Sequence, residues 1–211
     1  MRQLAERWQA LADRLRVNSE AGEAIRQLLL DSYRQFFRQY HDSAHLIDCF
    51  AQLDTIALQL EQPEVVEYGL WFHDIVCVPG AAGNEFLSAA AARYAAAELG
   101  LPAQFGQQAV QLILLTDHRG PASCRDGAYL ADIDLAVLGR DWPGFLEYER
   151  QIRAEYGYWP DADYRQGRRQ VIQQFLQRDA IYQTRHFRAK YEQIARRNLV
   201  ALSEQLMLNS Q

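Results

Sequence analysis

Residues 40–45 read YHDSAH and residues 71–75 read WFHDI, and the expected fold is organised around these two segments. His41 and His45 are four positions apart, so on a helix, or at its first turn, they share a face. The second segment carries an adjacent His-Asp pair at the end of an apolar stretch. Imidazole nitrogens and carboxylate oxygens suit a divalent transition metal or Mg²⁺. The two segments therefore indicate a metal site.

The residues between the two segments have a helical period. Asp42 or Ser43 can cap a helix in which every third or fourth residue is apolar: Leu46, Cys49, Phe50 and Leu53. Pro63 suits the first position of the next helix, which runs into the His-Asp pair. Gly69 in that helix costs stability, about 1 kcal/mol against Ala. We expect it to allow a neighbouring helix to approach closely.

The same period extends outward in both directions, and we find no alternating strand and no linker. Leu28 and Phe36 are expected on the buried side of a helix that starts near Ser19 and ends near residues 38–40. Asn84 is expected to cap an alanine-rich helix. The remaining helices are expected at about residues 4–15, 104–117, 130–138, 141–156, 162–178 and 184–207. The predicted fold class is therefore all-α. We expect one helical-bundle domain over residues 1–211, with a metal-binding core at about 38–140 and C-terminal helices at 141–207 packed on it.

Composition restricts the class of protein. The chain has 211 residues, 49% of them hydrophobic, and a formal net charge of −5. An acidic chain without a basic run is a poor binder of nucleic-acid polymers or anionic membranes. Its three cysteines have no metal-type spacing and are expected to be free thiols. The N-terminal residues lack a signal-peptide pattern, and no apolar run reaches the length of a membrane span. We therefore expect a cytoplasmic protein.

Five ordered segments resemble one known superfamily. They read WFHDIV at 71–76, NE followed by SA within 84–89, T-x-H at 116–118, DIDLAVLG at 132–139 and R-x-N-L at 196–199. With the preceding histidines, this set is similar to the HD superfamily of metal-dependent phosphohydrolases, in a little-characterised bacterial branch. The resemblance covers most of the chain, implies an HD-domain helical bundle, and says little about the substrate.

The resemblance implies four metal ligands: His45, His73, Asp74 and Asp134. The last of these follows the superfamily pattern of an acid before a leucine, and Asp132 is the alternative, with a solvent-facing or ligand-orienting role otherwise. Two imidazoles and two carboxylates would neutralise one divalent ion, such as Mn, Mg, Zn, Ni, Co or Fe, with a second ion as an option.

His41 has two readings. It resembles the proton donor of the cyclic-nucleotide phosphodiesterases, which are relatives of the superfamily, and it could instead hydrogen-bond a ligand carboxylate. Glu85 is a candidate catalytic base or substrate contact, or else an acid favoured at a helix start. His118 could bind a second metal or a phosphate, or act as a cation at a helix end.

Two arginines are candidates for holding phosphate oxygens, because arginine forms bidentate contacts with phosphate. They are Arg153 and Arg168. Arg153 also stands four positions after Glu149, a spacing that suits a surface ion pair.

Three functions fit these residues. The first is hydrolysis of a small phosphorylated substrate, such as a nucleotide, by a phosphomonoesterase or phosphodiesterase. The second is oxidation by an HD-fold di-iron oxygenase, for which only His41 and His118 are available as additional histidine ligands. The third is metal or nucleotide binding without catalysis. The sequence leaves the substrate, the metal and the oligomeric state open.

Overall fold

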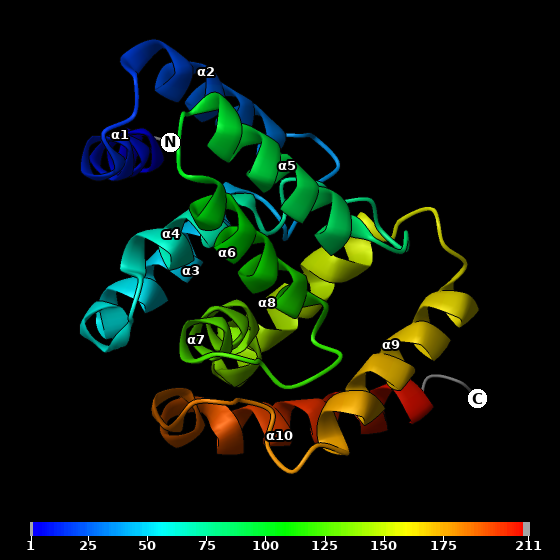
Figure 1. Cartoon of the computed structure of the whole chain (residues 1–211). Coiled ribbons are helices and arrows are strands. Elements are labelled where there is room, and N and C mark those ends of the chain that lie inside the picture. The colour runs from blue at the N-terminus through cyan, green and yellow to red at the C-terminus, as the bar shows by residue number, and fades with distance from the viewer. Residues whose placement is uncertain (1, 209–211) are drawn as a thin grey trace. The chain divides into compact units, whose positions relative to one another are not determined.

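The apolar period of the sequence produces helices throughout residues 2–208, the part of the chain that this computed structural model describes (Figure 1). No strand occurs among these residues, so the all-α prediction is confirmed. The α-helices are α1 (Arg2–Leu15), α2 (Ser19–Ser32), α3 (Ser43–Ile56), α4 (Pro63–Phe72), α5 (Asn84–Glu98), α6 (Ala103–Ile113), α7 (Arg125–Asp134), α8 (Trp142–Glu155), α9 (Asp161–Leu176) and α10 (Arg185–Leu208). Short 3₁₀ helices are η1 (Ala57–Gln59), η2 (Leu114–Asp117) and η3 (Leu135–Gly139).

Residue contacts divide the chain into two compact units, unit 1 (Met1–Ile133) and unit 2 (Asp134–Gln211). Unit 1 holds the segments around His41 and His73, and unit 2 holds the three C-terminal helices. No helix in residues 2–208 combines the length and the apolar character that crossing a membrane requires.

Helix α4 forms the centre of unit 1. Its residues from Val65 to Phe72 are all buried. It packs against α1, α3, α5 and α6, which cover its apolar residues, while the buried Glu67 pairs with Arg7 of α1. Trp8 of α1 meets Trp71 of α4 edge to face, with ring centroids 5.4 Å apart. The helix that ends at the His-Asp pair is therefore enclosed on several sides.

Gly69 permits the close approach that the sequence suggested. A Cβ atom at this position would lie 2.8 Å from Leu130 Cδ1 of α7 and 3.8 Å from Leu112 Cβ of α6. Real Cβ atoms do not come this close to a neighbouring carbon, so a larger residue at position 69 would have to displace the end of the buried Leu130 side chain. Glycine leaves the space that this side chain fills.

Two sequence expectations in unit 1 are wrong. Helix α2 ends at Ser32, earlier than expected, so Phe36 lies in the following turns and is 89% exposed, while Leu28 is 50% exposed. Gly83, with φ of 89°, precedes α5 in place of Asn84. The Asn84 side chain instead binds the Val78 backbone, accepting from its N–H at 3.2 Å and donating to its carbonyl at 3.0 Å. Turn chemistry, which apolar periodicity does not report, decides both boundaries.

Unit 2 is organised by α10, which packs on η3 and α9. The buried Asn198 amide donates to the carbonyls of Leu138 and Arg140, each at 2.9 Å. The Tyr182 hydroxyl donates to Leu135 O at 3.0 Å. The bond from Asn198 to Leu138 joins the R-x-N-L and DIDLAVLG segments, because η3 leaves carbonyls that its own helix does not use.

Candidate metal centre

His45 is positioned by the start of α3. The Asp42 carboxylate caps this helix, accepting from the N–H groups of Ala44 at 2.7 Å and His45 at 3.3 Å. His45 therefore lies in the first turn, and it is 4% exposed. The predicted cap is confirmed, and it fixes the position of the His45 side chain in the first turn of α3.

His73 follows the last residue of α4, and its tautomer is fixed by the backbone. Its Nδ1 lies 2.7 Å from Leu70 O. A carbonyl oxygen can only accept, so Nδ1 carries the proton and the neutral ring keeps its lone pair on Nε2. A hydrogen bond from the second ring nitrogen to a backbone carbonyl is usual for histidines that bind metal ions. The ring is 1% exposed.

Three ligand atoms of unit 1 converge. His45 Nε2 lies 3.1 Å from His73 Nε2, and Asp74 Oδ2 lies 3.0 Å from His73 Nε2 and 3.4 Å from His45 Nε2. Two atoms about 2.1 Å from one ion lie about 3.0 Å apart at right angles and about 3.4 Å apart at tetrahedral angles. The three separations match those of atoms that share one ion. We call His45, His73 and Asp74 the ligand triangle.

The charges at the triangle also favour a cation. Burial raises the pKa of Asp74, but the charges of His73 and His41, with hydrogen bonds from His45 and His73, outweigh it and hold that pKa well below its ordinary value. The hydrogen bond from His73 to Asp74 uses a proton on His73 Nε2. Without that proton, the lone pair of Nε2 faces the ionised carboxylate oxygen, and the two acceptors repel each other unless a metal ion lies between them.

Cys49 is a neighbour that the sequence analysis did not consider for the site. The ring nitrogens of His45 and His73 and the buried Cys49 sulfur all lie within 4.8 Å of one another. Its position four residues after His45 on α3 was the available signal. Its Sγ is 3.6 Å from His45 Nε2 and 3.8 Å from His45 Nδ1. Because these two distances are similar, the sulfur contacts the imidazole ring itself. It does not lie in the direction of the lone pair of one ring nitrogen.

The fourth predicted ligand falls at the division between the units. Asp134 ends α7, is partly exposed and is the first residue of unit 2. Asp132 belongs to unit 1 and is fully buried. The ligand triangle is described without either residue, and the choice of Asp134 over Asp132 stays a prediction.

His41 lies close to the triangle. Its ring centroid is 6.0 Å from that of His45, and Tyr40 contacts both rings, at 5.0 Å and 4.7 Å between centroids. Its charge contributes to the lowered pKa of Asp74, which places it near that carboxylate. His41 is partly exposed, whereas both triangle histidines are buried. This position suits a group that exchanges protons with a substrate.

Glu85 and His118 are both partly exposed residues of unit 1. Glu85 stands in the first turn of α5, and His118 has φ of 51° at the end of η2. Among the described residues of unit 1, neither joins the group formed by His45, Cys49 and His73. Their roles toward water or substrate stay predictions.

Both candidate phosphate-binding arginines make contacts inside unit 2. Arg153 binds Asp161 at 2.5 Å and Tyr156 O at 2.7 Å. Arg168 pairs with the buried carboxylate of Glu149, with Nε to Oε2 at 2.9 Å. Arg168, not Arg153, is thus the partner of Glu149. A phosphate would have to replace these bonds, and its binding by either arginine stays a prediction.

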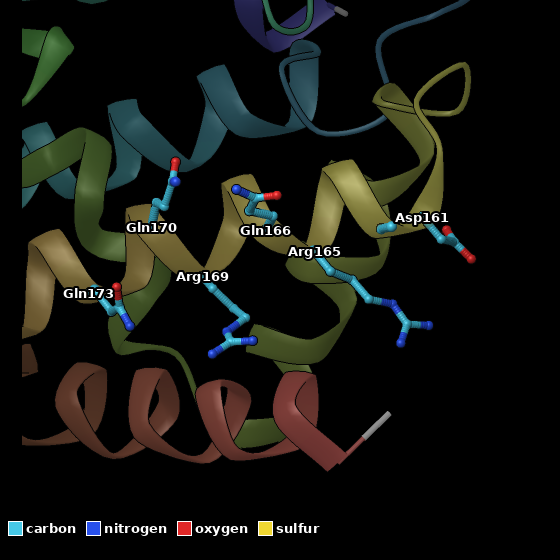
Figure 2. Close-up of a pocket in the computed structure, with 7 residues that line it drawn as sticks. Asp161, Arg165, Gln166, Arg169, Gln170 and Gln173 are labelled. Carbon is cyan, nitrogen blue, oxygen red and sulfur yellow. The ribbon is translucent and has the colours of Figure 1, made fainter. Parts of the chain in front are cut away.

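A hollow of about 600 Å³ lies along α9 in unit 2 and is lined by polar side chains (Figure 2). The side chains of Arg165 and Arg169 extend from this helix. The lining residues that are described all come from α9, so the hollow is a feature of one helix face.

Comparison with protein-family models, curated proteins and solved structures finds no match to this chain.

Proposed function

We propose that this protein is an HD-type metal-dependent phosphohydrolase that acts on a small phosphate ester such as a nucleotide. The ligand triangle carries the proposal, because its three interatomic distances fit one shared ion. The order of the histidine and aspartate motifs, which resembles the HD superfamily, supplies the reaction class.

His45, His73 and Asp74 would hold the ion, with Asp134 as the fourth ligand. A divalent ion supplies polarisation of a phosphoryl oxygen and a lowered pKa for bound water. The burial of both imidazoles excludes bulk water from one side of the triangle. The hydrogen bond from His73 Nδ1 to Leu70 O would leave the Nε2 lone pair of the neutral ring available to bind the ion.

In the proposed mechanism, His41 gives a proton to the leaving oxygen, and Glu85 is the candidate acceptor of the proton from the attacking water. A proton on His41 Nε2 or Nδ1 would move to the ester oxygen as the P–O bond breaks. The partly exposed His41 ring, next to the buried ring of His45, supports this division of roles.

The test uses His41→Ala with two classes of substrate. We expect the metal content to stay near that of the wild-type protein. Turnover of alkyl phosphate esters should fall by about 10²- to 10⁴-fold, the usual contribution of a general acid. Turnover of nitrophenyl esters should fall less, because nitrophenolate leaves without a proton. Phosphate release and metal content are the measurements.

The control is His186→Ala in unit 2, which removes a histidine outside the ligand triangle. It should change neither rate by more than about twofold. Equal losses on both substrates with metal retained, under conditions where chemistry limits the rate, would argue against proton donation by His41. A metal-loaded wild-type protein that hydrolyses no phosphate ester, and contains two irons and consumes oxygen, would contradict the proposed reaction class.

A further inference from the structure

Arg38 lies between α2 and α3, three residues before His41, and is only 5% exposed. Arginine side chains in proteins carry a positive charge. A buried charge of this kind is usually paired with a carboxylate. Within residues 2–208, however, the donors of Arg38 go to uncharged oxygens.

Those oxygens come from both segments that carry the candidate metal centre. Arg38 Nη1 donates to His41 O at 2.9 Å and to Asp74 O at 2.7 Å. Nη2 donates to Ile75 O at 2.8 Å, and Nε to Gln35 Oε1 at 3.1 Å. One nitrogen thus binds the backbone of the candidate proton donor and the backbone of a triangle ligand.

The guanidinium is also held from its face. Its central carbon lies 5.3 Å from the centroid of the Tyr33 ring. The Tyr33 hydroxyl donates to Trp71 O at 3.2 Å, two residues before His73. The Tyr33 ring therefore contacts the guanidinium while the guanidinium nitrogens bind the two segments.

We propose that Arg38 is the positioning residue of the metal centre. It sets the spacing between the backbone at His41 and the backbone at Asp74, and through them the distance from the proton donor to the ligand triangle. The planar guanidinium binds these two carbonyls through Nη1 and at the same time Ile75 O through Nη2 and Gln35 Oε1 through Nε, whereas a lysine ammonium is a single point that cannot reach all four oxygens. The inference rests on the proposed metal site and adds a residue that does not itself contact metal or substrate.

The experiment compares Arg38→Lys with Arg7→Lys. Arg7 is a matched control in unit 1, because it also uses its fork within the fold, with Nη2 to Asp54 Oδ1 at 2.7 Å and Nε to Glu67 Oε1 at 2.8 Å. Both variants lose the planar guanidinium group and keep the positive charge. Only Arg38 is bonded to the two metal-site segments.

The probe is Co²⁺ alone, followed by its visible absorption bands, which report coordination geometry. Loss of a group that orients metal ligands typically costs about 10- to 100-fold in metal affinity, and we expect that loss and altered bands for Arg38→Lys. Arg7→Lys should bind Co²⁺ within about twofold of the wild-type protein and keep its spectrum, even if both variants unfold at lower temperature.

Wild-type affinity and spectrum in Arg38→Lys would overturn the inference alone, and so would an equal loss in Arg7→Lys. A wild-type protein that binds no Co²⁺ would overturn the proposed metal site as well. If Arg38→Lys does not fold, Arg38→Gln, which buries no charge, takes its place with the same expectations. Failure of both variants to fold would assign Arg38 to stability and also overturn the inference.

Discussion

At the scale of single residues, one hydrogen bond of His73 determines which of its ring nitrogens could bind a metal ion. His73 Nδ1 must donate to Leu70 O, so in the neutral ring the other nitrogen carries the lone pair, 3.0 Å from Asp74 Oδ2. The sequence places His73 and Asp74 side by side, but only the turn at the end of α4 brings both toward His45. A neighbouring pair of residues normally points in different directions on a helix.

Cys49 offers a sharp test at the same scale. Because its sulfur contacts both ring nitrogens of His45 at similar distances, we expect it to pack against the ring and not to bind the ion. Wild-type protein loaded with Co²⁺ should then lack the near-ultraviolet band of a thiolate bound to cobalt, and Cys49→Ala should bind the same amount of Co²⁺. The exposed Cys124 provides the control, Cys124→Ala. A sulfur-to-cobalt band that disappears only in Cys49→Ala would make Cys49 a ligand.

Close helix packing sets the frame of the site at the scale of secondary-structure elements. Helix α4 carries His73 at its end and meets α7 at Gly69, where a Cβ atom would lie 2.8 Å from Leu130 Cδ1. An alanine there gains about 1 kcal/mol of helix propensity but displaces the Leu130 side chain, at a cost of about 1–3 kcal/mol if its neighbours must also move. The two effects have opposite signs, and because Leu130 is fully buried we expect overpacking to outweigh the gain.

We therefore predict that Gly69→Ala lowers the thermal midpoint of unfolding, measured by circular dichroism. Gly167 in α9 is the matched control, because a Cβ atom there has no neighbour within 4 Å. Gly167→Ala should raise stability by about 1 kcal/mol or less. A stabilised Gly69→Ala would show that Leu130 moves aside without cost, and would remove the structural reason for glycine at this position.

At the scale of the whole chain, apolar periodicity predicted much of the fold. It did not predict the helix ends that turn residues determine. The cap of α3 at Asp42 and the start of α4 at Pro63 could be predicted from the sequence, because a single side chain determines each of them. The end of α2 at Ser32 was not, since apolar residues continued to Phe36 at helical spacing. Exposed aromatic residues look like buried ones in a periodic pattern.

The candidate site was predictable to a similar degree. Ligand types and order indicated His45, His73 and Asp74, and these three converge. Spacing alone could not find Arg38, because its role depends on backbone carbonyls, and every residue has one. The expectation of one domain over residues 1–211 stays a prediction. The division into two units, each compact by itself, does not test it.

Whether the ligand triangle binds a metal ion can be measured by metal analysis of protein purified without chelator. We predict about one equivalent of a divalent ion per wild-type chain, lost in His73→Ala together with part of the thermal stability, because bound metal stabilises the folded state. His186→Ala should keep the ion. Full occupancy in a folded His73→Ala variant, or a wild-type protein that takes up no divalent ion, would contradict the account.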